Sequence, residues 1–186
     1  TALPPSVRHL ILDRLERLEP DDRHVLDQIA ILGNATSYTI LRVLLGKDGL
    51  EEKALVEALR RLLATGLVGE GTDGQDVAYT ITHPLVQEVA YAEQPEIVRR
   101  RAHLAAIEAL ESFFEKRPGD ESRLARHYSA AGPDANRDRA LSALIAAGER
   151  ALTIYANEEA TRHYGTALAM IREGGGLRVE GGVLPR

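Results

Sequence analysis

Residues 67–82, with the sequence LVGEGTDGQDVAYTIT, decide the fold of this chain. Leu67–Glu70 and Val77–Thr82 are short runs with the composition of β-strands, and Gly71-Thr72-Asp73-Gly74 between them has the composition of a turn. We therefore predict a small β-hairpin, although the patterns on both sides of it are helical.

Three helical patterns precede the hairpin. Apolar residues recur at helical spacing in residues 20–32, 37–45 and 50–64. Pro20 is suited to a first helical position, Gly33 to a C-terminal cap, and Thr36 or Ser37 to the N-terminal cap of the second helix. Three helices followed by a hairpin is the element order of a winged helix-turn-helix, which we assign to residues 19–92.

The rest of the chain is predicted to be helical, and one further helix, at 7–18, precedes the winged helix. The helices after the hairpin are predicted at 84–91, 95–116, 121–131, 137–155 and 157–171. The last two have a tetratricopeptide-like pattern of small and large residues, formed by Leu144, Ala147, Gly148, Ala151, Ala160, Tyr164 and Ala167. We expect the small residues Gly148, Ala160 and Ala167 to let the two helices approach closely.

The predicted fold class is therefore mainly α, with a winged helix-turn-helix and its small β-hairpin followed by TPR-like α-hairpins at residues 93–172. His127-Tyr128 and His163-Tyr164 lie 36 residues apart, which is close to the tetratricopeptide period of about 34 residues. The glycine-rich residues 173–186 have no periodicity, and we expect them to form a flexible tail.

Composition excludes several classes of function. The 186 residues include no cysteine, so disulfides, thiolate metal sites and a cysteine nucleophile are excluded. The net charge of −5 gives no general attraction to nucleic acid. No apolar run approaches the roughly 20 residues that span a bilayer, and we recognise no signal peptide, so we expect a cytoplasmic location and no membrane contact.

Several phrases, in order along almost the whole chain, resemble one family. They are Leu3-Pro4-Pro5-Ser6-Val7, LDRLERL at 12–18, Ala30-Ile31-Leu32-Gly33, YTITHPLVQEVAY at 79–91, RRRAH at 99–103 and LARHY at 124–128. The chain is similar to the region that follows the nucleotide-binding core in bacterial STAND-type AAA ATPases. These include large LuxR-type regulators and proteins linked to an adenylate cyclase.

The resemblance implies a non-catalytic regulatory segment that couples nucleotide state to partner-sensing repeats. Residues 1–18 would then end the helical subdomain of the ATPase core, and the core would be an intramolecular partner of the winged helix. In the family, a histidine in a Met-His-Asp-like motif reaches the phosphate of bound ADP. Thr82-His83-Pro84-Leu85 matches at His83 and at the apolar Leu85 but departs at Thr82 and Pro84.

Two roles for His83 remain open from sequence. An imidazole beside a helix N-terminus can donate to a phosphate, and the helix dipole favours the negative charge there. The alternative role is structural: His83 would cap the following helix and form a hydrogen bond with the backbone.

For the helical repeats, the resemblance implies that they bind a protein or peptide partner.

We expect no enzyme activity from this segment. Its only Gly-Lys, at Gly46-Lys47, is followed by Asp48, and Leu41 occupies the place of the first P-loop glycine. ATP or ADP is therefore a cofactor of the parent protein, and none is expected here. His24 with Asp27 and Glu159 with His163 are pairs one turn apart, whereas a zinc site needs three or four ligands, so no metal site is predicted.

The alternative function is a DNA-binding winged-helix transcription factor with a helical dimerisation domain. The third helix offers Lys53, Arg60 and Arg61 as candidate DNA or partner contacts. The same helix carries Glu51, Glu52 and Glu57, and residues 70–76 of the wing are acidic without any Lys or Arg. We therefore favour a protein-packing module and do not expect DNA to bind through this segment.

A second basic cluster, formed by Arg99, Arg100 and Arg101, begins the helix predicted after the winged helix. Positive charge is unfavourable at a helix N-terminus, so the cluster is a candidate contact for an acidic partner or another domain. The competing explanation is a solvated face whose arginines pair with Glu93, Glu96 or Glu108.

Overall fold

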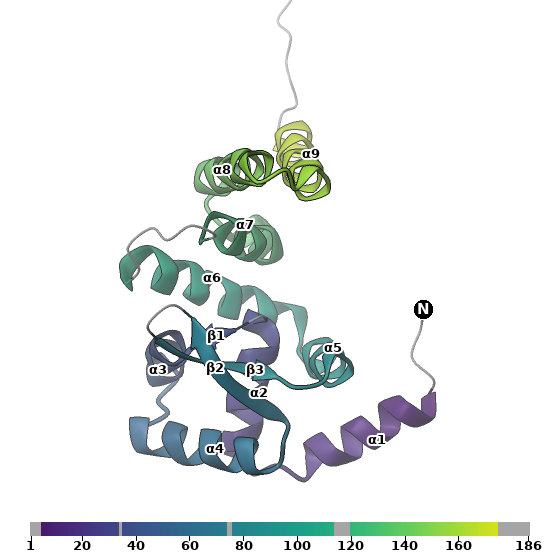
Figure 1. Cartoon of the computed structure of the whole chain (residues 1–186), viewed down its shortest axis with the longest axis vertical. Helices are drawn as coiled ribbons and strands as arrows, with labels where there is room; N and C mark the ends of the chain where they lie inside the picture. The colour runs from purple at the N-terminus through teal and green to yellow at the C-terminus, as the bar shows by residue number, and fades with distance from the viewer. Residues whose placement is uncertain (1–4, 34, 74–75, 114–119, 175–186) are drawn as a thin grey trace, which may run out of the picture. The chain divides into compact units, whose positions relative to one another are not determined.

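The computed structural model describes residues 5–33, 35–73, 76–113 and 120–174. Within these residues the protein is mainly helical and contains one small antiparallel sheet of three strands (Figure 1). The prediction of a mainly α fold with a small hairpin is confirmed at this level. None of the helices in the described ranges has the length and apolar character needed to cross a bilayer.

The chain divides into two compact units, Thr1–Glu115 and Lys116–Arg186. The elements of the first unit are α1 (Pro5–Glu16), α2 (Pro20–Leu32), β1 (Thr36–Ser37), α3 (Tyr38–Lys47), α4 (Glu52–Ala64), β2 (Val68–Asp73), β3 (Asp76–Ile81), α5 (Pro84–Glu93) and α6 (Glu96–Phe113). Those of the second unit are α7 (Asp120–Ala131), a short 3₁₀ helix at Gly132–Asp134, α8 (Arg137–Thr153) and α9 (Asn157–Gly174).

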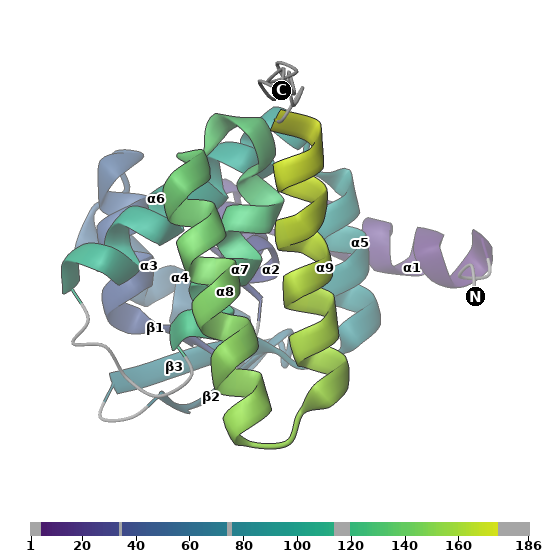
Figure 2. The same ribbon diagram turned by 90° about the horizontal axis from the view of Figure 1, so that it is seen from above.

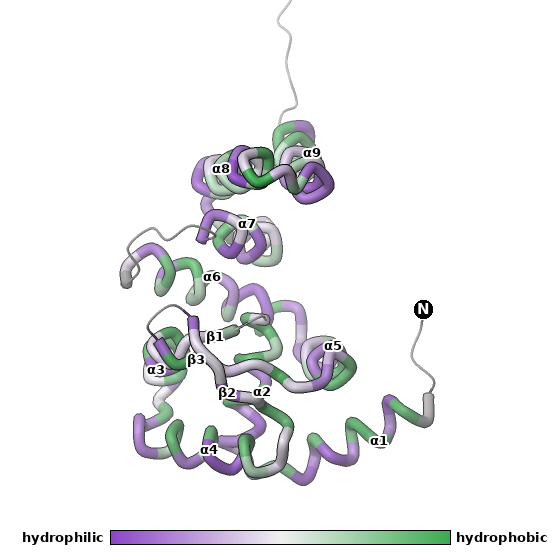
Figure 3. The backbone as a smooth tube through the Cα atoms, viewed as in Figure 1, coloured by the Kyte–Doolittle hydropathy of each residue, from purple (hydrophilic) through white to green (hydrophobic). Residues whose placement is uncertain are grey.

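Helix α2 forms the centre of the first unit. It contacts α3, α4, α5, α6 and β3. Val25, Leu26 and Ile29 are at most 1% exposed, and burial extends beyond the predicted apolar stripe to Asp27 and Gln28. Each fully buried Leu or Ile stabilises the fold by about 1.5–3 kcal/mol relative to an exposed one. Along helix α4, in contrast, hydrophobic and hydrophilic segments of the backbone alternate (Figure 3), as expected for a helix with one buried and one exposed face.

The predicted hairpin is present, but its turn was predicted too early. Strands β2 and β3 pair from Val68↔Ile81 to Asp73↔Asp76, so Gly71, Thr72 and Asp73 belong to β2. Backbone hydrogen bonds form this ladder, and polar residues are tolerated because the outer part of β2 is largely exposed. The rest of the predicted turn, at residue 74, lies outside the described residues.

The short strand β1 was not predicted, because two residues carry no periodicity. It pairs with β3 through Thr36↔Tyr79 and Ser37↔Ala78. Ser37 is also the N-cap of α3, and its Oγ accepts a hydrogen bond from the Ile40 amide at 3.3 Å. A second acceptor comes from the hairpin, since Asp76 Oδ2 lies 3.2 Å from the Thr39 amide. The acidic hairpin therefore also stabilises the positive end of α3.

The other predicted helices are present with boundaries shifted by a few residues. The first ends at Glu16 instead of 18, and Gly33 adopts the positive φ of 60° expected of a helix-ending glycine. Residues 114–116 of the predicted long helix and residues 175–186 of the predicted tail lie outside the described residues. Residues 173 and 174 end α9.

The second unit is built around a tightly packed pair of helices, α8 and α9, which lie side by side (Figure 2). Its core includes Ala125, Leu144, Ala147 and Ala167. The closest approach is at Gly148, where an added Cβ would lie 2.7 Å from the ring of Tyr164. The predicted role of Gly148 in close helix packing is therefore confirmed. Gly165, in contrast, has no atom within 4 Å of an added Cβ.

We expect opposite effects from two glycine-to-alanine substitutions in this hairpin. Gly148→Ala should destabilise the protein by about 1–3 kcal/mol, because Tyr164 must move out of its packed position. Gly165→Ala should stabilise it by about 0.5–1 kcal/mol, because alanine is the better helix former and meets open space. Urea unfolding at low protein concentration measures both. Equal effects of the two substitutions would contradict the packing at Gly148.

Candidate functional site

His83 lies at the junction between the sheet and α5. The ladder of the hairpin ends just before it, where the Thr82 amide donates to the Leu67 carbonyl at 3.0 Å. Pro84 then occupies the first position of α5, where its missing amide costs no hydrogen bond. The backbone of His83 is therefore held on one side by a paired strand and on the other by a helix.

The imidazole of His83 does not cap α5. His83 is the N-cap residue, but its side chain makes no capping hydrogen bond and is exposed. Its backbone carbonyl instead accepts from the amides of Val86, at 2.9 Å, and Gln87, at 3.2 Å. His83 therefore caps α5 as the structural alternative expected, but through its backbone and not through its side chain, and the ring is available to a group outside the described residues.

Helix α5 is linked at its other end to α1. Glu93 Oε1 lies 2.5 Å from Arg8 of α1. Helix α1 is also held by Arg14, which donates to the carbonyl of Thr65 at 2.6 Å, and by the buried Leu15. Leu10 on the same helix is 70% exposed. Helix α5, which directly follows His83, is thus connected to α1, and α1 presents an apolar side chain to solvent.

The predicted basic residues of α4 have different roles. Arg61 binds the carboxylate of Asp22 on α2 through Nε and Nη2, at 2.6–3.0 Å. Asp22 is only 4% exposed, so Arg61 joins α2 to α4 and is a poor candidate for a DNA contact. Arg60 pairs with Glu57 on its own helix at 2.9 Å. Lys53 is exposed on α4.

The surface beside these residues is acidic, and two neutral tyrosines, the half-buried Tyr38 and the buried Tyr79, lie next to it. Burial and a hydrogen bond to Glu52, 2.9 Å long, raise the pKa of Tyr38. Burial and the charge of Glu70 raise the pKa of Tyr79. Both phenols stay uncharged at neutral pH and add nothing to offset the carboxylates of the hairpin. This surface lacks the positive charge that phosphate binding needs.

The basic cluster at the start of α6 is engaged mainly within the first unit. The guanidinium carbon of Arg99 lies 4.7 Å from the centroid of the Tyr91 ring, an attractive cation–π arrangement. Arg100 forms an ion pair with Glu96, one of the three partners considered. The other two acids pair elsewhere, Glu93 with Arg8 and Glu108 with Lys47. Arg101 is exposed, so the three arginines do not form one free patch.

The described residues contain no group of three or more His, Cys, Asp or Glu side chains that could hold a metal ion. His24 faces Asp48 at 3.4 Å instead of Asp27, which binds Arg23 at 2.8 Å. Burial raises the pKa of Asp27, with Arg23 opposing the shift. His163 lies 3.4 Å from Glu159, as its spacing predicted, but this remains a single pair.

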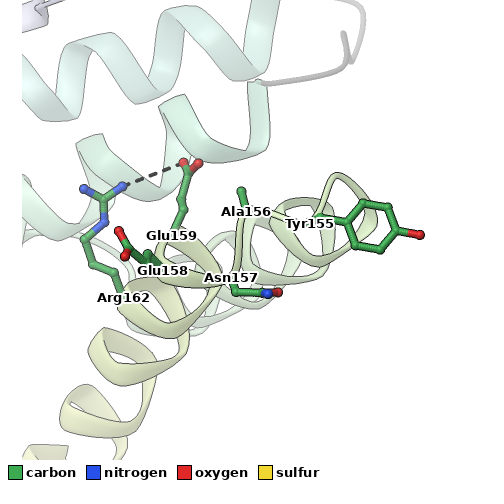
Figure 4. A pocket seen from close by; sticks show the side chains of 6 residues that line it. All are labelled: Tyr155, Ala156, Asn157, Glu158, Glu159 and Arg162. Carbon is green, nitrogen blue, oxygen red and sulfur yellow. Dashed lines mark ion pairs between the residues drawn. The ribbon is translucent and has the colours of Figure 1, made fainter.

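An open hollow lies at the turn between α8 and α9 (Figure 4). It is lined by Tyr155, Ala156, Asn157, Glu158, Glu159 and Arg162. Arg162 faces Glu159 at 3.7 Å, whereas Tyr155 is 86% exposed and points away from the others. Tyr155 also has a φ of 61°, a left-handed conformation that costs a non-glycine residue about 1 kcal/mol. The sequence pattern identified neither the hollow nor this conformation.

The two arginines of α4 should respond differently to removal. Arg61→Ala should lower Tm by several degrees, because the buried carboxylate of Asp22 loses its partner. Arg60→Ala should leave Tm almost unchanged, because its pair with Glu57 is exposed. Thermal unfolding followed by circular dichroism compares them, and an equal loss in both variants would contradict the assigned role of Arg61.

The comparisons with known proteins add no assignment to this geometry. No protein-family model, curated protein sequence or solved structure matches the chain.

Proposed function

We propose that the chain is a non-catalytic regulatory segment of a STAND-type signalling ATPase or transcriptional regulator. In this proposal residues 19–92 form a winged helix, residues 93–172 form tetratricopeptide-like hairpins, and residues 1–18 end the helical subdomain of an ATPase core. The segment couples the nucleotide state of that core to repeats that bind a protein or peptide partner. ATP or ADP binds to the ATPase core, and the segment responds to which nucleotide is bound there.

The observation that carries the proposal is the free imidazole of His83. It is exposed, makes no capping bond and stands at the N-terminus of α5. A helix N-terminus favours negative charge, and an imidazole N–H donates to phosphate oxygen. Thr82, Pro84 and Leu85 beside it are also exposed. A neighbouring domain can therefore bring a phosphate to His83 without disturbing the core of the first unit.

The contacts within the first unit supply a route for coupling. Helix α5 contacts α2, and α2 contacts α6, the last helix of that unit. At its far end α5 is joined to α1 by the ion pair of Glu93 with Arg8. Movement at His83 would act on packed helices, which transmit displacement because interiors are dense.

Packing in the second unit supports the tetratricopeptide-like part of the proposal. Ala160 and Ala167 are buried on α9, and Tyr164 packs on Gly148 of α8. These are small and large residues at the positions where the repeat pattern places them. The turn between the helices leaves Tyr155 and the polar Asn157 exposed, where a partner can reach them.

The role of His83 is tested in the full-length protein that contains this segment. We expect its gene to encode a P-loop upstream and the purified protein to retain ADP. Loss of one charge-assisted hydrogen bond to phosphate should weaken ADP binding about 10- to 100-fold in His83→Ala, or make the output constitutive. Bound ADP is measured by chromatography of the heat-released nucleotide.

His24→Ala is the matched control, because His24 is a half-exposed histidine of the same unit that faces Asp48. It should leave ADP retention unchanged. Unchanged retention and unchanged output in His83→Ala would refute the sensor role, as would an open reading frame of this length without a P-loop.

The DNA-binding alternative predicts a different measurement. With Arg61 bound to Asp22 and Arg60 to Glu57, we expect no gel shift of duplex DNA even at low salt. A shift that weakens with rising salt and is reduced by Lys53→Ala would instead establish the transcription-factor function. Arg150→Ala is the comparison variant, since it removes an exposed positive charge from α8, outside both candidate clusters, and should leave such a shift unchanged.

A further inference from the structure

Helix α9 has a well-defined outer face. Its inner face is buried through Ala160, His163 and Ala167. Helical periodicity places a second stripe on the opposite side. That stripe, called here the outer face of α9, consists of Glu158, Thr161, Gly165, Ala169 and Arg172, all exposed. Leu168 flanks it and is 53% exposed, so the face combines small, apolar and terminal charged residues.

Gly165 has no role in packing within the described residues. A Cβ at this position would meet nothing within 4 Å, whereas a Cβ at Gly148 would collide with Tyr164. A glycine inside a helix weakens that helix. Gly165 leaves a flat spot in the middle of the outer face, where a second helix can approach closely.

The charges of the outer face are arranged symmetrically about this glycine. Glu158 lies seven residues before Gly165, and Arg172 lies seven residues after it. If two copies of α9 cross in opposite directions at Gly165, each Glu158 lies opposite the Arg172 of the other copy. Thr161 of one copy then lies level with Ala169 of the other, while Leu168 and Arg162 lie on opposite flanks of the contact. A parallel crossing would oppose like charges, which is unfavourable.

The helix is also held firmly at the end that carries Arg172. Arg137 at the start of α8 donates to the carbonyl of Met170 at 2.8 Å and to that of Ile171 at 3.3 Å. These bonds satisfy carbonyls near the C-terminus of α9 and fix the last turn. A preorganised surface loses less conformational entropy on binding.

We propose that the outer face of α9 binds the same face of a second copy of this chain, in an antiparallel two-fold arrangement centred on Gly165. The charges of Glu158 and Arg172 favour a second copy of α9 as the partner, because in an antiparallel orientation each charge faces one of opposite sign. One pair of helices buries less area than a standard interface, so the dimer is weak, with a Kd on the order of 10–100 μM. The proposal does not depend on the nucleotide-sensing role of His83.

A charge exchange tests the proposal on the 186-residue chain. Sedimentation equilibrium from about 5 to 500 μM, a range that brackets the expected Kd, should show a monomer–dimer equilibrium at low salt. Glu158→Arg alone and Arg172→Glu alone should each weaken the dimer about 10-fold or more, since symmetry turns two attractive pairs into two repulsive ones. The double variant should restore the wild-type Kd within about threefold, because the pairs are re-formed with reversed sign.

Two further variants separate the interface from general effects. Gly165→Leu should abolish the dimer while circular dichroism and Tm show an intact fold, because the side chain projects into open space in the monomer. Glu149→Arg changes an exposed charge on α8 and should leave the dimer unaffected. A chain that is monomeric at every concentration, or a double variant that stays as weak as the single ones, would overturn the proposal.

Discussion

The burial of α2 on nearly all sides is the constraint on which the first unit depends. Every helix from α3 to α6, together with β3, packs against it. Such a position forces its polar groups to find partners, and Asp22 does so through Arg61 of α4. This explains why a basic residue of α4 faces inward, and it removes a charge that a DNA-binding surface would need.

The packing around α2 also fixes the position of the His83 backbone. Helix α5 contacts α2 along one side, so the strand-to-helix junction before it is a fixed point on the surface. The backbone carbonyl of His83 satisfies the first amides of α5, which leaves the imidazole unused. An exposed donor on a rigid support is compatible with the role that we propose for His83. The carboxylates of the hairpin, in contrast, interact with the amide of Thr39 in α3 and with Tyr79 of the sheet.

In the second unit, close packing leaves one helix face without a partner in the described residues. Gly148 lets Tyr164 lie against α8, and the buried alanines bring the two helices together. The opposite side of α9 then carries Gly165, which packs against nothing in the described part of the unit and lies between charges of opposite sign. Both glycines lie inside helices, but within the described residues only Gly148 faces another helix.

The sequence by itself determined the helices, the hairpin and the close approach at Gly148, because helical periodicity, turn residues and helix caps are local properties. It also placed His83 between the strand and the following helix. Only the tertiary structure decided that Arg61 binds Asp22, that Arg99 stacks on Tyr91 and that the ring of His83 is free. These contacts depend on which elements pack together, and local sequence patterns do not specify the packing between elements.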